Sequence, residues 1–115
     1  MEIGIDIEQN ERFKNVTEKF IERAYTKNEI AYATKFVNNH EQFCALWCVK
    51  EATVKAFSNL KIPFQEIEVS ATPEGRPFIV KNETILNELK KAGCTEIKVS
   101  LSHSKDYSTA VVLIY

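Results

Sequence analysis

Charged side chains interrupt the most apolar helical stretch of the sequence, residues 47–57. Lys50, Glu51 and Lys55 all lie within it. At 100° per residue, Glu51 and Lys55 share one helical face beside the apolar stripe. A surface ion pair in the favourable i, i+4 order, worth about 0.2–0.5 kcal/mol, is by itself enough to explain them. A carboxylate that borders a buried face is nevertheless costly without a compensating cation, so Glu51 is also a candidate site residue.

A second acidic residue, Asp6, follows Ile3 and Ile5 in an alternating N-terminal stretch. A single aspartate at a strand end is ordinarily a cap or turn residue. If Asp6 and Glu51 met, they would form a site for a hard cation, because Mg²⁺ takes one or two carboxylates together with phosphate oxygens and water. Sequence spacing does not show whether they meet, so both interpretations stay open.

Polar side chains also gather where a later strand ends, at Ser102, His103, Ser104 and Lys105. Hydroxyl, imidazole and ammonium groups are good ligands for anions. An ordinary polar hairpin turn explains the same residues. A serine hydrolase is disfavoured, because the sequence has no Gly-x-Ser-x-Gly elbow.

Composition excludes several classes of protein. The chain has 115 residues and a net charge of −1, which indicates one domain, 1–115, and argues against a protein built mainly to bind nucleic acid. No apolar run of about 18 residues is present, so no membrane span is expected. The N-terminus lacks the features of a signal peptide, and we expect a cytoplasmic protein.

The three cysteines are consistent with a protein that works in a reducing compartment. Cys44 and Cys48 lie one helical turn apart, and Cys94 stands alone. A metal pair is conceivable, but no histidine or further cysteine stands at finger-like spacing. Packing thiols are therefore the favoured interpretation.

Hydrophobic periodicity predicts an α+β fold, with a mainly antiparallel sheet and a long central helix. Thr26 and Glu29 form a capping box, which opens a helix. Strands are expected at 2–8, 66–71, 78–81, 97–102 and 110–114, and helices at about 13–24, 27–36, 40–59 and 84–92.

A series of short motifs covers nearly the whole chain. They are Gly4-Ile5-Asp6-Ile7; Arg12-Phe13; Phe20, Arg23, Thr26 and Glu29; Trp47, Lys50, Glu51, Ala52, Lys55 and Ala56; Gly75-Arg76-Pro77; and Ser100, Ser102, His103, Tyr107 and Ala110. In this order and spacing they resemble the holo-[acyl-carrier-protein] synthase family, the short members of the 4′-phosphopantetheinyl transferase superfamily.

The resemblance implies an enzyme that moves the 4′-phosphopantetheine arm of coenzyme A onto a serine of an acyl carrier protein and releases 3′,5′-ADP. It implies Mg²⁺ bound by Asp6 and Glu51, with Glu51 also accepting the serine proton. It places Lys55 at the phosphates and the leaving group. The residues implied to contact coenzyme A are Lys50, Lys55 and His103, with Ser102 and Ser104 as further candidates.

The resemblance also implies partners. Carrier proteins present acidic helices, and a basic patch for docking is expected at Arg12, Lys14, Lys19 and Arg23. A solvated helix face is the alternative, because glutamates are mixed among these residues. Family members of this size are typically homotrimers with sites between subunits, and we expect the same here.

The sequence departs from the family's pattern at some positions. Gln9 replaces a common glutamate, Leu46 replaces a usual arginine, and the link after the long helix is short, at 58–61. Gln9 and Leu46 favour an alternative, a relative that binds carrier or nucleotide without turnover. A further alternative is an unrelated interaction module, in which Asp6, Glu51 and His103 would lie far apart.

Overall fold

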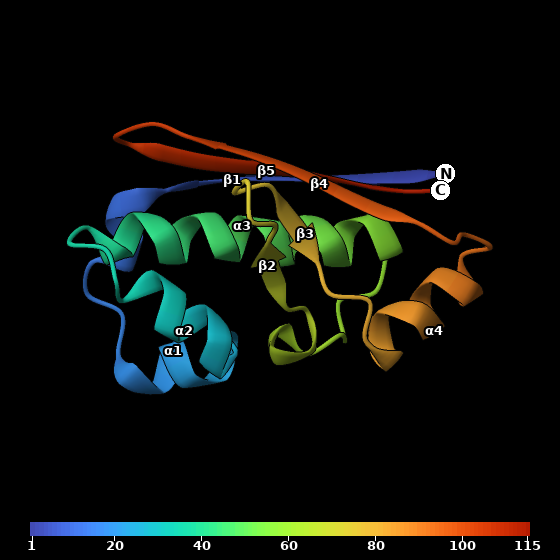
Figure 1. Cartoon of the computed structure of the whole chain (residues 1–115), viewed down its shortest axis with the longest axis horizontal. Coiled ribbons are helices and arrows are strands. Elements are labelled where there is room, and N and C mark those ends of the chain that lie inside the picture. Colours follow the sequence, from blue (N-terminus) through green and yellow to red (C-terminus); the bar gives the residue numbers. More distant parts are fainter.

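An antiparallel sheet packed against one long helix forms the centre of the molecule. The computed structural model describes all residues, 1–115. The sheet has the order β1 (Glu2–Gln9), β5 (Tyr107–Ile114), β4 (Ile97–His103), and α3 (Asn39–Phe57) runs along one of its faces (Figure 1). The predicted α+β architecture, with a mainly antiparallel sheet and a long central helix, is confirmed.

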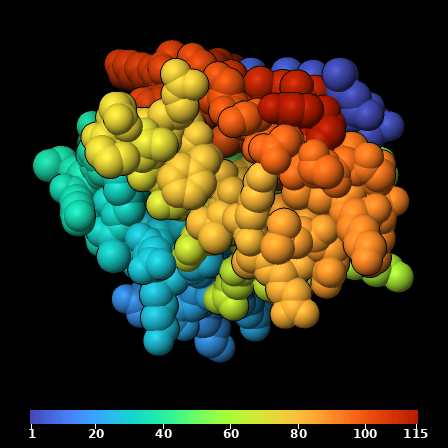
Figure 2. All heavy atoms as spheres, turned by 45° about the vertical axis from the view of Figure 1, so that its right-hand side comes forward, coloured from blue at the N-terminus to red at the C-terminus, as the bar shows by residue number.

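The remaining elements surround α3. In Figure 1, α1 and α2 lie on the side of α3 that faces away from the sheet. Figure 2 shows the β2–β3 hairpin (yellow) and α4 (orange) side by side on another face of the molecule, with the sheet above them. These elements are η1 (Asn10–Phe13), α1 (Glu18–Ala24), α2 (Lys27–Ala33), η2 (Phe64–Glu66), β2 (Val69–Ala71), β3 (Pro77–Ile79) and α4 (Glu83–Lys91).

Threonine caps set the starts of the two short helices. The predicted capping box is present, with Thr26 accepting from the Glu29 amide and Glu29 accepting from the Thr26 amide. The helix expected at about 13–24 is in two pieces. Thr17 accepts from the Phe20 amide and caps α1, which begins only at Glu18, whereas Phe13 ends the separate turn η1.

The first strand presents its apolar face to solvent. Ile3, Ile5 and Ile7 are 65%, 63% and 61% exposed, whereas Gly4 is buried. The alternation correctly predicts a half-buried strand, but the buried half is the face that carries Gly4 and Asp6. The isoleucines instead form the outer face of the sheet.

The core is centred on α3. Cys44 and Cys48 are fully buried, and the Cys48 thiol donates to the Ser108 carbonyl of β5 at 3.3 Å, which identifies both as packing thiols. On the opposite side, the Trp47 ring packs against Phe20 and Phe64 at centroid distances of 5.4 and 4.8 Å. No helix has both the length and the apolar character to cross a membrane.

Candidate active site

The close approach of β1 to α3 determines where the acidic residues lie. A Cβ atom at Gly4 would stand 1.9 Å from the Ala52 carbonyl oxygen and 2.7 Å from the Ala56 nitrogen. Only glycine therefore lets the strand lie this close to the helix. Asp6, two residues on and on the same face, is thereby brought to the helical face of Glu51 and Lys55.

Lys55 and Asp6 form an ion pair at the edge of this contact. The Lys55 ammonium lies 3.1 Å from Asp6 Oδ1 and donates to the Ile5 carbonyl at 2.9 Å. The Asp6 side chain is 14% exposed, and its Oδ2 is buried without any hydrogen-bond partner. A buried carboxylate oxygen without a donor costs free energy, so this atom is poised for a ligand.

The Glu51 carboxylate is part of the same cluster. Burial raises its pKa, the nearby charges of Asp6 and Glu8 raise it further, and Lys55 acts in the opposite direction. The two carboxylates that the sequence singled out therefore lie close enough to repel each other. The interaction-module alternative required them to be far apart, and the structure does not support it on this point.

These residues fit a hard divalent cation. The unpartnered Asp6 oxygen and the neighbouring Glu51 carboxylate supply hard oxygen ligands, the kind that Mg²⁺ prefers. No group of three or more histidine, cysteine or acidic side chains is arranged to enclose a metal. Two carboxylates suit an ion such as Mg²⁺, which takes one or two protein carboxylates and completes its shell with other oxygen ligands.

Lys50 does not belong to this site, which corrects its assignment as a ligand of coenzyme A. Its side chain is fully buried, and its ammonium lies 2.7 Å from Glu29 Oε1. It also donates to the Phe64 and Ile67 carbonyl oxygens, both at 2.7 Å. An ammonium has three donors, and all are occupied, so no phosphate can reach it.

His103 lies at the other edge of the sheet, in a cavity of about 430 Å³. The lining of this cavity carries little positive charge, because Leu46 is apolar and Glu68 is negatively charged. The other lining residues come mainly from α2, α3 and the β2–β3 hairpin: Asn28, Tyr32, Gln42, Ala45, Val69, Ser70, Ala71, Gly75, Pro77 and Leu101. Within one chain, β5 separates the strand that carries His103 from the strand that carries Asp6.

The two candidate serines do not line the His103 cavity. Ser102 precedes His103 on β4, so its side chain points to the opposite face of the sheet. Ser104 lies in the β4–β5 turn, where its hydroxyl accepts from the Tyr107 amide at 3.3 Å. This contact is the polar-turn role that the sequence left open for Ser104.

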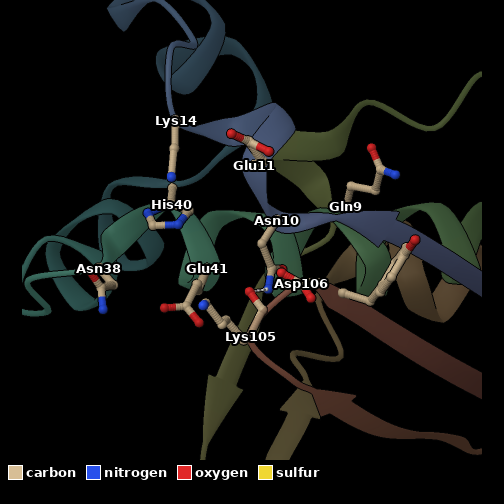
Figure 3. A pocket seen from close by; sticks show the side chains of 10 residues that line it. Gln9, Asn10, Glu11, Lys14, Asn38, His40, Glu41, Lys105 and Asp106 are labelled. Carbon is tan, nitrogen blue, oxygen red and sulfur yellow. Dashed lines mark hydrogen bonds between the residues drawn. The ribbon is translucent and has the colours of Figure 1, made fainter.

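The expected basic patch is split between two elements. Arg12 lies on η1 and pairs with Glu8 at 2.6 Å, whereas Lys19 and Arg23 are exposed on α1. Lys14 lies between them and lines a separate polar cavity of about 560 Å³ at the end of β1, which also contains His40 (Figure 3). That cavity contains neither Asp6 nor Glu51.

Comparison with known proteins shows to which family this chain belongs. The model of the 4′-phosphopantetheinyl transferase superfamily matches residues 2–112. This chain belongs to that superfamily. A holo-[acyl-carrier-protein] synthase of Aquifex aeolicus is 40% identical over 119 residues, covering 97% of this chain and 96% of the relative. One from Clostridium tetani is 36% identical, covering 97% and 93%.

Solved structures of the superfamily share the fold. A Bacillus anthracis holo-(acyl-carrier-protein) synthase in complex with CoA (3′,5′-ADP) superposes with a TM-score of 0.82 at 28% identity, covering 98% of this chain and 94% of that one. A Helicobacter pylori synthase in complex with coenzyme A gives 0.83 at 25% identity, covering 98% and 99%. The resemblance inferred from the motifs is confirmed.

Sequence reasoning missed Glu8 and Glu29 as functional neighbours in this superfamily member. Glu8 lies two residues after Asp6, and strand periodicity already places it on the same face. Glu29 was recognised as a capping residue and as part of a family motif, but not as the partner of Lys50. Its pairing with Lys50 joins two helices, and no local pattern signals such a contact.

Proposed function

We propose that this chain transfers the 4′-phosphopantetheine group of coenzyme A to a serine of an apo acyl carrier protein, with Mg²⁺ bound, and releases 3′,5′-ADP. The serine Oγ forms the new bond to phosphorus, and the bond to the 3′,5′-ADP oxygen breaks. Family membership supports the reaction class. One observation in the chain itself carries the proposal: a buried, unpartnered Asp6 oxygen lies beside Glu51 and Lys55.

The roles follow from the contacts. Asp6 and Glu51 would hold the cation, which when bound neutralises charge on the diphosphate and orients it. Glu51 is also proposed to accept the serine proton, directly or through water, because its carboxylate would lie beside the bound diphosphate. Lys55 is 48% exposed at its side chain, so its ammonium can turn from Asp6 toward the leaving phosphate.

The His103 cavity is proposed to take the nucleotide end of coenzyme A. His103 supplies the only basic side chain in its lining, since Leu46 occupies the position of the family's usual arginine. This observation favours a second candidate function, a relative that binds without turnover. Calorimetry with coenzyme A and Mg²⁺, followed by a transfer assay on the same sample, separates binding from catalysis.

A homotrimer with sites between subunits is part of the proposal. The exposed isoleucine row of β1 lies beside the half-buried Val111 and Leu113 on the outer face of β5, and so large an apolar strip is typical of an interface. Asp6 and His103 are carried by opposite edge strands of the sheet. In a cyclic assembly, the β1 edge of one copy would face the β4 edge of the next and bring one chain's carboxylates toward another chain's His103 cavity.

Ile5→Lys on this outer face is expected to disrupt the assembly. A lysine at a buried interface leaves an unpaired charge, so the variant should sediment as a monomer under conditions in which the parent sediments as a trimer. Lys90→Ala on α4, whose exposed side chain lies away from the sheet, is the control. A parent chain that sediments as a monomer at micromolar concentration would contradict the trimer.

Arg23→Glu is expected to weaken carrier docking alone. Because Arg23 is exposed on α1 and has no ion-pair partner, reversing its charge should raise KM for an acidic carrier about fivefold and leave KM for coenzyme A unchanged. Arg12 is a poorer choice, since its pairing with Glu8 links it to the carboxylate cluster. Steady-state kinetics with Lys90→Glu on α4 as control checks this. An equal rise in KM for the carrier and for coenzyme A would contradict a docking role for Arg23.

The proposed activity is tested by incubating the chain with coenzyme A, Mg²⁺ and a panel of apo carriers. We expect the intact mass of a carrier to increase by one phosphopantetheine group, and the increase to disappear with EDTA. A panel that spans fatty-acid and polyketide carriers identifies the substrate class. A cytoplasmic location is also proposed, because all three cysteines are free thiols.

A further inference from the structure

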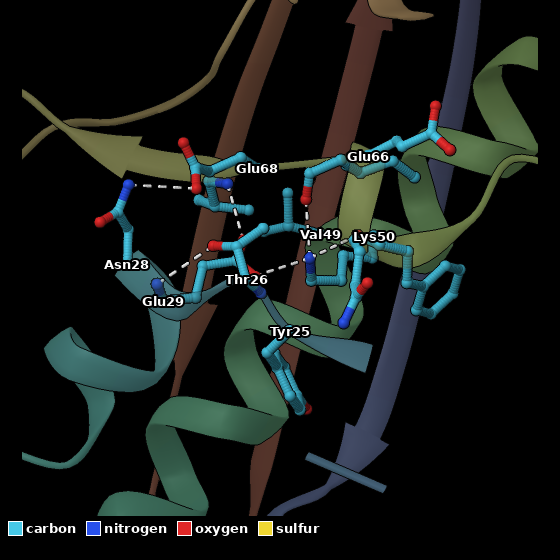
Figure 4. Close-up of polar contacts among 12 residues, drawn as sticks. Tyr25, Thr26, Asn28, Glu29, Val49, Lys50, Glu66 and Glu68 are labelled. Carbon is cyan, nitrogen blue, oxygen red and sulfur yellow. Dashed lines mark hydrogen bonds and ion pairs between the residues drawn. The ribbon is translucent and has the colours of Figure 1, made fainter. Parts of the chain in front are cut away.

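Lys50 is the centre of a buried polar cage that the reaction does not use. Its ammonium contacts Glu29 and two backbone carbonyls, and all of these contacts measure 2.7 Å. The side chains of Lys50 and Glu29 are both fully buried, and Figure 4 shows their contact. Burial lowers the pKa of Lys50 and Glu29 opposes that shift. The three acceptors require the charged ammonium with its three donors.

Glu29 extends the cage to two further backbone groups. Its Oε1 accepts from the Thr26 amide at 2.9 Å, and its Oε2 accepts from the Val69 amide at 2.8 Å. Lys50 on α3 and Glu29 on α2 thus fix the start of α2 and the beginning of β2 to the central helix. The Phe64 and Ile67 carbonyls attach the η2 segment to the same point.

The segments joined by this cage also form walls of the His103 cavity. Asn28 and Tyr32 line it from α2, and Glu68 and Val69 line it from the start of β2. Across the rim, the Asn28 amide donates to the Glu68 carboxylate at 3.4 Å (Figure 4). The cage lies directly behind these walls, because Glu29 follows Asn28 and bonds the Val69 amide.

We infer that Lys50 and Glu29 are positioning residues for the nucleotide end of coenzyme A, because their buried ion pair holds α2 and β2 at the separation that the His103 cavity requires. This inference rests on the proposed function, which places the nucleotide in that cavity. It explains why a lysine next to Glu51 in the sequence points away from the carboxylate site.

The alternative is a pair that only stabilises the fold. The two roles differ in what a variant changes. A purely stabilising pair, when removed, lowers stability and leaves the kinetic constants of the folded fraction intact. A positioning pair, when removed, raises KM for coenzyme A specifically, while KM for the carrier and kcat stay close to those of the parent.

The test uses Lys50→Met and the double variant Lys50→Met with Glu29→Gln. The double variant leaves no unpaired buried charge and keeps an oxygen for the Thr26 or Val69 amide, so it keeps the inference testable if the single variant fails to fold. Leu89→Ala is the matched control, because Leu89 is buried on α4 and does not line the cavity. All kinetics are measured where urea titration shows each chain to be fully folded.

We expect KM for coenzyme A to rise about tenfold in the Lys50 variants, with kcat and carrier KM within about twofold and with Leu89→Ala unchanged. A KM for coenzyme A no higher than in Leu89→Ala overturns the inference. Hydrogen exchange supplies a readout that needs no activity: the Val69 and Thr26 amides should exchange at least about tenfold faster than in Leu89→Ala. Unchanged exchange also overturns the inference, whereas a parent chain without transfer overturns only the proposed function.

Discussion

Glu51→Gln is expected to lower Mg²⁺-dependent transfer at least about a thousandfold, because one substitution removes a ligand charge and the proton acceptor. The glutamine keeps the size of the side chain, so the contact between β1 and α3 remains. The loss should appear in kcat, measured by the rate of carrier mass gain at saturating coenzyme A.

The same variant should be more stable than the parent without metal. Burial and the charges of Asp6 and Glu8 raise the Glu51 pKa above its ordinary value of 4.5, so the folded chain binds this proton more tightly than the unfolded chain does. Stability from this group is therefore present at low pH and lost as pH rises. Glutamine removes the charge, and the thermal midpoint should rise at neutral pH and match the parent's below the ordinary pKa.

Two comparisons make this prediction decisive. Glu41→Gln, at the first turn of α3 and outside the carboxylate cluster, should change neither activity nor the response to metal. In the presence of coenzyme A, added Mg²⁺ should raise the thermal midpoint of the parent further and leave that of Glu51→Gln unchanged. Normal turnover by Glu51→Gln would refute its role.

Gly4→Ala is expected to be the most disruptive small substitution. A methyl group 1.9 Å from a backbone oxygen cannot be accommodated, so β1 must move away from α3. We expect a loss of about 3 kcal/mol in the free energy of unfolding, measured by urea titration. Transfer should fall as well, since Asp6 moves with the strand.

Gly93→Ala is the matched control for this variant. Gly93 has a φ of +71°, but nothing lies within 4 Å of its added methyl group. Its cost should be about 1 kcal/mol of backbone strain, without any change in transfer. A Gly4→Ala chain with the stability and activity of Gly93→Ala would contradict the close strand–helix contact.

Local patterns predicted the elements because the interactions that form them are local. The Thr26–Glu29 box, the alternation of β1 and the apolar run of β5 each involve neighbours in sequence. Residue type at apolar borders singled out Asp6 and Glu51 one by one, but only the resemblance to the family implied that they act together.

The direction in which each side chain points could not be predicted from local patterns. Alternation in β1 shows that one face is apolar, but not that Gly4 lets the other face pack on the helix. Similarly, Lys50 and Glu51 are adjacent in sequence, yet a helix turns by 100° between them. One therefore enters a buried cage made by distant residues, and the other reaches Asp6.

The central claim is that Asp6 and Glu51 together hold one divalent ion. A crystal structure with coenzyme A and Mn²⁺ in place of Mg²⁺ tests it most directly, through the anomalous scattering of manganese. We predict one anomalous peak in contact with both carboxylates and with the diphosphate. A peak located elsewhere, or one that contacts neither Asp6 nor Glu51, would contradict the account.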